Sequence, residues 1–390
     1  MNLVHALSRP ESYPHTPPMV EVRETHISWV FLAGMRAYKL KKPLTLDFLD
    51  YGTAQRRRHM CQEEVRLNRR LAPELYLGVR GVVEIADGVK LAAEDDPRAV
   101  DFVVEMRRYD ETCTLAARIN RGEVEREHVR AAGELIAGFH AQARRVTSKG
   151  APVLAVERRF ERNLHELLSS VEQRGEVTRV QALERFAHAF ITAHATTFQS
   201  RADRGLIREG HGDLRAEHVL VEGDRVEIVD CVEFDPELRQ LDVSDDLAFL
   251  VLDLAAQGGG HFADALIGAY RDGGGDPGGD YLIAFYAAYR ALVRAKVALV
   301  RASQLPEHSG AHASQSARAR DLIFLAERFA WRARLPLVLI VCGVPASGKF
   351  ASGACPRGDI WIAVRQLGPG PEAPGGRRSH ASRSTRGLRG

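Results

Sequence analysis

Strand-like and helix-like hydrophobic patterns alternate in the first third of the chain. Residues 27–42 are rich in β-branched and aromatic residues on both sides of an Ala-Gly-Met turn, which predicts two strands joined as a hairpin. Residues 53–71 place apolar side chains about one turn apart and are followed by Pro73, which predicts a helix that ends there. Strand-like runs follow at 77–85 and 101–106. Together these elements indicate a small α+β lobe.

From residue 127 onward the pattern is mostly helical. Apolar spacing predicts six helices, at 127–144, 157–172, 179–200, 263–271, 281–304 and 311–333. A polar interruption at 207–234 contains two strand-like runs, 218–221 and 226–231, around a Glu-Gly-Asp turn. Because loops held by a rigid scaffold often carry catalytic residues, this interruption is where we expect a functional site.

Near the C-terminus a strand-like run at 337–342 leads into a phosphate-binding motif. Residues 343–349 match G-x-x-x-x-G-K, the loop that cradles nucleotide phosphates, but Phe350 stands where a magnesium-binding Ser or Thr is expected. A domain of this type needs several more strands, which the remaining residues do not provide. We therefore expect three motif residues to be vestigial: Gly343, Gly348 and Lys349.

The final 40 residues lose the pattern of a folded domain. Residues 351–390 are rich in Gly, Pro and Arg and contain one aromatic residue, Trp361, so they predict a disordered tail. The abrupt loss of pattern at Phe350 suggests a chain truncated at the start of a P-loop domain, 335–350, with an out-of-frame or aberrant end.

Composition excludes several classes of protein. The chain has 54 Lys and Arg against 51 Asp and Glu, and the net charge of +3 is concentrated in the tail, so the rest has no global field for nucleic acid or membrane. The five cysteines are scattered without a C-x-x-C pair, which favours reduced thiols over disulfides or a zinc ribbon. No signal sequence or apolar stretch of membrane-spanning length is apparent, and we expect a soluble, cytoplasmic protein.

The interruption at 207–234 contains the strongest chemical motif. It begins with His211-Gly212-Asp213, and His218 and Asp230 follow Asp213 at intervals of 5 and 17 residues. Phosphoryl transfer from ATP needs a carboxylate to orient and deprotonate the acceptor hydroxyl, and oxygen or nitrogen ligands for Mg²⁺. These residues can supply both requirements.

The motif and the segments around it resemble a known family. In order, the chain contains ETHISWVFLAGMRAYKLKKP, RLNRRLAPELYLGV, HGDLRAEHVLV, IVDCVEFDPELRQLDVSDDLAFL and GVPASGK. They are similar to the aminoglycoside-phosphotransferase-like branch of the protein-kinase-like fold, in particular to bacterial proteins that join this domain to a C-terminal P-loop ATPase/kinase domain. The resemblance implies a bilobal α+β fold with a β-rich N-lobe at 20–108 and a mostly helical C-lobe at 109–334, which contains the catalytic loop 211–218.

In this family the loop reads H-G-D-x-x-x-x-N. The resemblance therefore implies that Asp213 is the catalytic base and Asp230 the principal Mg²⁺ ligand, while His211 orients the loop. His218 occupies the Asn position, and its imidazole is a softer, poorer Mg²⁺ ligand than an amide oxygen. Asp246 resembles the helix-start Asp that holds this loop, although an acidic residue there also suits a helix N-terminus.

The other half of the ATP site should be a strand lysine paired with a helix glutamate. Lys39 matches the A-x-K spacing, with Lys41 on the same strand face as the reserve candidate. Glu64 best fits the glutamate, with Glu63 as the alternative. The family pattern makes 105–109 the hinge between the lobes, and the backbone of Glu105 and Met106 is expected to meet adenine.

The expected function is Mg²⁺-dependent transfer of the γ-phosphoryl group of ATP, or GTP, to a hydroxyl of a small molecule. The expected partner is this small-molecule acceptor. Neither a membrane nor a nucleic acid is an expected partner. One alternative is a nucleotide-binding pseudokinase, in which His218 marks lost catalysis. Another is a metal-dependent phosphohydrolase that uses His211, Asp213, His218 and Asp230. Histidines on the predicted helices, His165, His188 and His194, are expected to be solvated or packed in the core.

Overall fold

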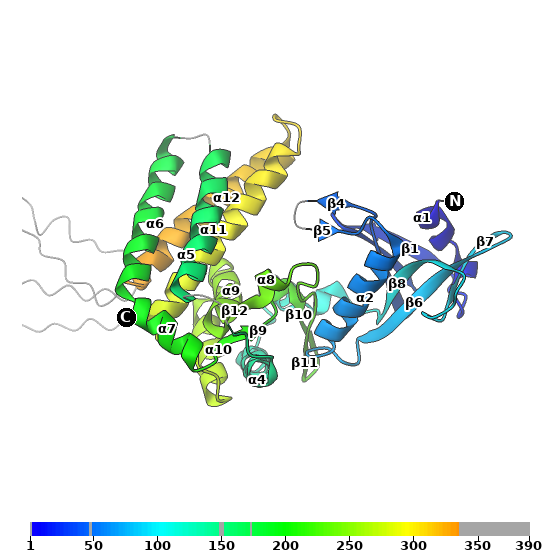
Figure 1. The fold of residues 1–390 in the computed structure, drawn as a ribbon, viewed down its shortest axis with the longest axis horizontal. Helices are drawn as coiled ribbons and strands as arrows, with labels where there is room; N and C mark the ends of the chain where they lie inside the picture. Colours follow the sequence, from blue (N-terminus) through cyan, green and yellow to red (C-terminus); the bar gives the residue numbers. More distant parts are fainter. Residues whose placement is uncertain (1, 47–48, 148–151, 172–173, 335–390) are drawn as a thin grey trace, which may run out of the picture. The chain divides into compact units, whose positions relative to one another are not determined.

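The computed structural model describes residues 2–46, 49–147, 152–171 and 174–334 (Figure 1). Contacts divide the chain into two units, Met1–Ala333 and Arg334–Gly390. The predicted P-loop start and tail, 335–390, lie outside the described residues, and so do Gly343, Gly348 and Lys349.

The N-terminal part of the chain is built on a six-stranded antiparallel sheet. Its strand order is β1-β2-β3-β8-β6-β7, and a separate small hairpin pairs β4 with β5. The bounds are β1 Val20–Glu24, β2 Ser28–Ala33, β3 Arg36–Lys41, β4 Thr45–Leu46, β5 Leu49–Asp50, β6 Tyr76–Ile85, β7 Gly88–Ala92 and β8 Ala99–Arg107. The predicted hairpin at 27–42 is confirmed as β2 and β3, which turn at Gly34 with a φ of 61°.

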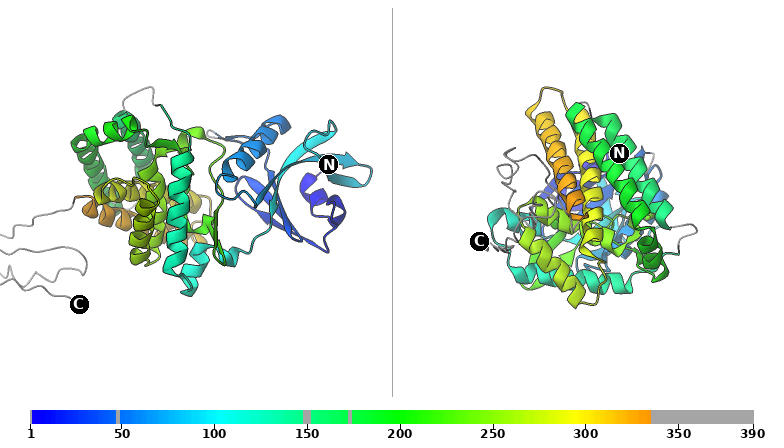
Figure 2. Two further views of the ribbon diagram at one scale, coloured as in Figure 1. Left: turned by 90° about the horizontal axis from the view of Figure 1, so that it is seen from below. Right: turned by 90° about the vertical axis from the view of Figure 1, so that its left-hand side faces the viewer.

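Both faces of this sheet are apolar, because each is covered. Helix α2 (Ala54–Asn68) packs on one face with Cys61 and Val65, and Thr53 caps it by accepting a hydrogen bond from Arg56 N. Helix α1 (Leu3–Leu7) and the 3-10 turn Pro10–Ser12 cover the other face (Figure 2). Residues before the expected N-lobe start at 20 therefore contribute to its core.

Helices dominate the remainder of this unit, shown in green to orange in Figure 1. The helices are α3 Leu115–Arg121, α4 Arg126–Gln142, α5 Pro152–Ser170, α6 Arg174–Ala193, α7 Ala195–Asp203, α8 Pro236–Arg239, α9 Val243–Ala256, α10 Gly260–Asp272, α11 Asp280–Ser303 and α12 Gly310–Arg332. Two small antiparallel pairs lie among them, formed by β9 Ile207–Glu209 with β12 Gln240–Asp242 and by β10 Val219–Glu222 with β11 Arg225–Ile228.

Two predictions about helices need correction. The helix predicted at 179–200 is two helices, α6 and α7, with a break at His194, whose backbone leaves the helical region at ψ 18°. The apolar pattern gave no range for helix α9, although the resemblance indicated a helix start at Asp246. This helix is buried continuously from Val243 to Leu254, so no solvent-facing side gives it a helical period.

Candidate active site

A buried carboxylate on α9 binds the backbone of the loop between β9 and β10. Asp246 on α9 accepts hydrogen bonds from His211 N at 2.6 Å and Gly212 N at 2.9 Å, and its Oδ2 lies 3.1 Å from His140 Nε2. Burial alone would raise the pKa of Asp246, but these donors hold it well below its ordinary value. The expectation that Asp246 supports the loop is confirmed.

The close approach of Asp246 requires a glycine beside the motif. A Cβ at Gly210 would lie 2.4 Å from Asp246 Oδ2. We expect Gly210→Ala to lower the free energy of unfolding by about 1–3 kcal/mol, because the buried carboxylate must move away from its donors. Urea unfolding measures this change. The control is Gly268→Ala on α10, where nothing lies within 4 Å of the new Cβ, so stability should be kept or slightly raised. Equal losses in both variants would contradict the prediction.

His211 uses both ring nitrogens within the protein. Its Nε2 donates to the carbonyl of Val229 at 2.9 Å, and its Nδ1 accepts from Asp213 N at 3.3 Å. Complete burial lowers the pKa of His211 to about 4, so the ring is neutral. With no free lone pair, His211 fixes the loop and is not placed to bind a metal.

His218 has the opposite arrangement. Its Nδ1 lies 2.8 Å from the backbone oxygen of Asp213, and because a carbonyl only accepts, this nitrogen carries the proton. The lone pair is therefore on Nε2. The Asp213 carboxylate is 32% exposed, and its Oδ2 lies 3.7 Å from His218 Nδ1 and 4.0 Å from Arg215 Nη1. Asp213 thus offers an accessible carboxylate beside an imidazole with an available lone pair.

Asp230 follows β11 in an uncommon backbone conformation. Its φ is 62°, which is rare for a residue other than glycine and occurs where surrounding contacts fix the chain. Those contacts come from the N-terminal half: Asp230 N donates to Tyr76 Oη at 3.4 Å, and Cys231 N donates to Asn68 Oδ1 at 2.9 Å. Asp230 is therefore fixed relative to both α2 and the sheet.

Lys39 joins the two halves of the site. Its Nζ lies 2.9 Å from Glu64 Oε1 and 3.0 Å from Asp230 Oδ1. Mainly because of Lys39, the pKa of Asp230 lies well below its ordinary value, although half of the Asp230 side chain is exposed. The structure thus brings together three residues proposed from the sequence, and keeps Asp230 ionised.

The reserve lysine occupies a different environment. Lys41 is fully buried, and its Nζ contacts Glu64 Oε2 at 2.6 Å and Glu233 Oε1 at 2.5 Å. Tyr51 Oη also donates to Glu233, at 2.9 Å. Glu64 therefore binds both candidate lysines. Since only Lys39 also reaches a half-exposed carboxylate, the geometry favours Lys39 for contact with a ligand and Lys41 for holding Glu64.

The alternative glutamate points elsewhere. Glu63 pairs with Arg66 at 2.8 Å on the same helix, and this hydrogen bond lowers the pKa of Glu63. Helix α2 thus presents Glu64, and not Glu63, to the lysines.

Glu105 and Met106 lie inside β8, between β3 and β6. The Glu105 side chain accepts from Tyr38 at 3.3 Å and from Arg80 at 2.7 Å, away from the lysines. β8 has strand partners on both sides up to Met106, and Arg107 N and Arg108 N donate to Leu75 O and Met35 O, so the backbone up to Arg108 is engaged within the protein. This favours the Tyr109 end of the predicted hinge.

An apolar cluster lies on the lysine face of the sheet and includes side chains that the sequence did not single out. Met106 and Ala37 pack there with Leu220 of β10, and Tyr109 lies against the same cluster. Leu220 comes two residues after His218, which immediately precedes β10, so a candidate metal ligand and an apolar contact lie close together in the sequence. The signal was the continuous apolar run at 219–221.

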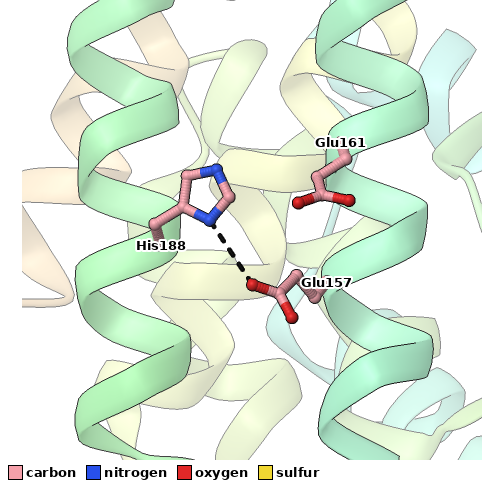
Figure 3. Close-up of side chains that lie close together, drawn as sticks. All are labelled: Glu157, Glu161 and His188. Carbon is pink, nitrogen blue, oxygen red and sulfur yellow. Dashed lines mark ion pairs between the residues drawn. The ribbon is translucent and has the colours of Figure 1, made fainter.

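A second group of ligand-type side chains lies far from this loop in the sequence. Glu157 and Glu161 on α5 face His188 on α6, and their ligand atoms lie within 4.8 Å of one another (Figure 3). The side chains of Glu157 and His188 are partly exposed and form an ion pair at 3.6 Å. This pairing agrees with the expectation of a solvated helix histidine.

Other expectations concern the whole chain. Cys61, Cys113 and Cys231, the three cysteines in the described part, are free thiols. Within the same part, no helix combines the length and apolar character needed to cross a membrane.

Comparison with known proteins gives relatives in sequence and in structure. No family model matches the chain. Uncharacterized proteins of Mycobacterium tuberculosis and Mycobacterium bovis are each 36% identical over 342 residues, which is 87% of this chain and 65% of theirs. The chain therefore spans about 65% of the length of these relatives.

The fold comparison is more informative. A choline/ethanolamine kinase family protein from Mesorhizobium loti superimposes with a TM-score of 0.50 at 16% identity, covering 86% of this chain and 99% of that one. Its match extends over both the sheet-based and the helical part. The chain has the mixed α+β, bilobal kinase-like fold of that protein.

Proposed function

We propose that this chain is an ATP-dependent phosphotransferase that moves the γ-phosphoryl group to a hydroxyl of a small molecule. One observation carries the proposal: Lys39 bridges Glu64 on α2 and Asp230 at the end of β11. His211 connects this point to the catalytic loop, because it donates to Val229, the neighbour of Asp230. The proposed nucleotide-binding residues and the candidate base Asp213 are thereby connected through hydrogen bonds and ion pairs.

Each residue has a separate task in this proposal. Lys39, oriented by Glu64, binds phosphate oxygens, and Asp213 accepts the proton of the acceptor hydroxyl. Asp230 and His218 Nε2 would hold Mg²⁺, which neutralises charge on the phosphates when bound. Lys39 contacts Asp230 in this structure, so binding of the nucleotide would replace that ion pair with contacts to phosphate.

The side chains of Asp230 and His218 suit a divalent cation, and their chemistry suggests which divalent cation is preferred. Asp230 offers a hard carboxylate oxygen, whereas the His218 lone pair is a softer nitrogen donor. We expect Mn²⁺ to support ATP turnover at lower concentration than Mg²⁺. His218→Asn should reduce this difference, because an amide oxygen replaces the imidazole.

Activity titrations with each metal measure the effect, and Asp224→Asn serves as the control, since Asp224 is exposed in the turn between β10 and β11. An unchanged ratio of Mn²⁺ to Mg²⁺ requirement in His218→Asn would show that His218 is not a ligand.

The direct test of the function is acceptor-stimulated release of ADP from ATP, with GTP in parallel, across hydroxylated small molecules that include aminoglycosides, sugars and amino alcohols. Stimulation by one class supports the phosphotransferase. A pseudokinase would bind nucleotide without turnover, and His218 at the position of the usual Asn is the observation that favours it. The phosphohydrolase alternative is disfavoured because both nitrogens of His211 are already engaged.

A further inference from the structure

A cavity of about 510 Å³ opens beside the catalytic loop. It lies among α3, the loop, and helices α9, α11 and α12, and none of its lining residues was singled out from the sequence. Arg215 and Glu217 of the loop contribute to its wall. Asp213 does not line the cavity itself, but the side chain of Arg215 links the two, since its Nη1 is 4.0 Å from Asp213 Oδ2.

Positive charge is concentrated in this cavity. Four of its lining residues are arginines, Arg215, Arg294, Arg318 and Arg328, against three acidic residues, Asp253, Asp321 and Glu217. Two of the acids are already engaged. Asp253 pairs with Arg294 and accepts from Ala216 N, while Glu217 pairs with Arg215 at 2.6 Å.

Arg318 has no ion pair among the residues that the structure describes. Arg318 is exposed, and its pKa is lowered by desolvation and by repulsion from Arg294 and Arg215, while Glu217 acts in the opposite direction. The nearest arginines therefore disfavour its charge, and an anion placed between them would relieve this repulsion.

Two side chains that line the cavity each carry a buried polar atom without a hydrogen-bond partner. The two atoms are Arg215 Nε, a donor, and Gln257 Oε1, an acceptor. A buried polar atom without a partner costs free energy unless a ligand or water satisfies it. Both atoms are covered by protein in this structure, so a ligand in the cavity would satisfy them only after the two side chains reorient. Leu322, Ala116 and Ala255 add an apolar wall, as expected for a site that binds a small organic molecule.

We propose that this cavity binds the acceptor and selects molecules that carry a carboxylate or phosphate together with the hydroxyl. The proposal rests on the phosphotransferase function and adds the class of substrate. The anionic group contacts Arg318 and Arg215, and this contact places the hydroxyl toward Asp213. A choline-like or aminoglycoside-like cation would instead meet the arginines with the same sign of charge.

The first experiment tests the cavity without relying on activity. The full-length protein, with its nucleotide site filled by MgADP, is treated with the arginine reagent phenylglyoxal, and labelled peptides are quantified by mass spectrometry. Inorganic phosphate and D-glycerate are the probes, and chloride at equal ionic strength is the reference. Arg320, on the same helix but outside the cavity, is the internal control.

We expect phosphate or glycerate to slow the labelling of Arg318 and to leave Arg320 unchanged. Protection by only one of the two probes identifies that anion as the group recognised. Labelling of Arg318 and Arg320 that responds equally, or only to ionic strength, overturns the proposal.

The second experiment links the cavity to turnover. ADP release is compared for glycerol, D-glycerate, glycerol 3-phosphate and choline, with wild type, Arg318→Gln and the control Arg320→Gln. For an anionic acceptor, Arg318→Gln should lower kcat/KM on the order of ten-fold, the size of a lost charge-assisted hydrogen bond, while Arg320→Gln has no effect.

The outcomes separate the two proposals. Protection of Arg318 without turnover of any acceptor supports an anion site and counts against the phosphotransferase. Turnover of neutral or cationic acceptors that is insensitive to Arg318→Gln, without protection, supports the phosphotransferase and overturns the anionic acceptor.

Discussion

The Asp213→Asn protein should bind MgATP with wild-type affinity but release ADP about 10²–10⁴-fold more slowly in the presence of acceptor, the usual contribution of a general base. The Asp213 side chain is 32% exposed, and the nitrogens of His218 and Arg215 that face it lie 3.7 Å and 4.0 Å away. Asparagine therefore fits the same position without leaving a buried charge unpaired. The loop keeps its conformation because Asp246 binds its backbone.

Steady-state ADP release gives the turnover, and a fluorescent-nucleotide titration gives the affinity. Asp224→Asn is the matched control, because it removes an exposed carboxylate from the neighbouring hairpin. Wild-type turnover in Asp213→Asn would remove Asp213 as the base. Loss of nucleotide binding in this variant would instead show that Asp213 acts at the nucleotide.

Local pattern predicted the fold best where β-branched and aromatic residues marked a hairpin or a clear helical period marked a helix. The hairpin of β2 and β3 and the long helices α4 and α11 were predicted nearly at their observed bounds. The apolar pattern gave no range for helix α9, because the packing that buries Val243 to Leu254 removes the helical period; only the resemblance indicated its start at Asp246. The edge strands β1 and β7 were not predicted, although each pairs with the strand next to it in the sequence.

In the candidate site, the sequence predicted residue types better than it predicted their partners. The A-x-K spacing puts Lys39 and Lys41 on one strand face, and both contact Glu64. Their difference comes from residues almost 200 positions away, Asp230 for Lys39 and Glu233 for Lys41. The arginine-lined cavity could not be predicted from the sequence for the same reason. Its residues come from five separate segments that only the fold brings together.

Replacement of the two lysines should separate catalysis from stability. We expect Lys39→Met to lower kcat/KM on the order of 10²-fold, because one donor to the transferring phosphate is lost. The protein should still fold, since Asp230 is half-exposed and Glu64 keeps its contact with Lys41. Removal of Lys39 also raises the pKa of Asp230 toward its ordinary value, which still leaves it ionised at neutral pH.

Lys41→Met should lower the stability of the folded protein. It leaves Glu64 and Glu233 facing each other in the interior without the buried cation between them, and the free energy of unfolding should fall by about 3–5 kcal/mol. Urea unfolding and steady-state kinetics on both variants provide the comparison, with Lys42→Met as the control because Lys42 pairs with the exposed Glu24. If Lys41→Met lost turnover at unchanged stability while Lys39→Met remained active, Lys41 would be the phosphate-binding lysine. Glu64 would then still serve as its partner, since it contacts both side chains.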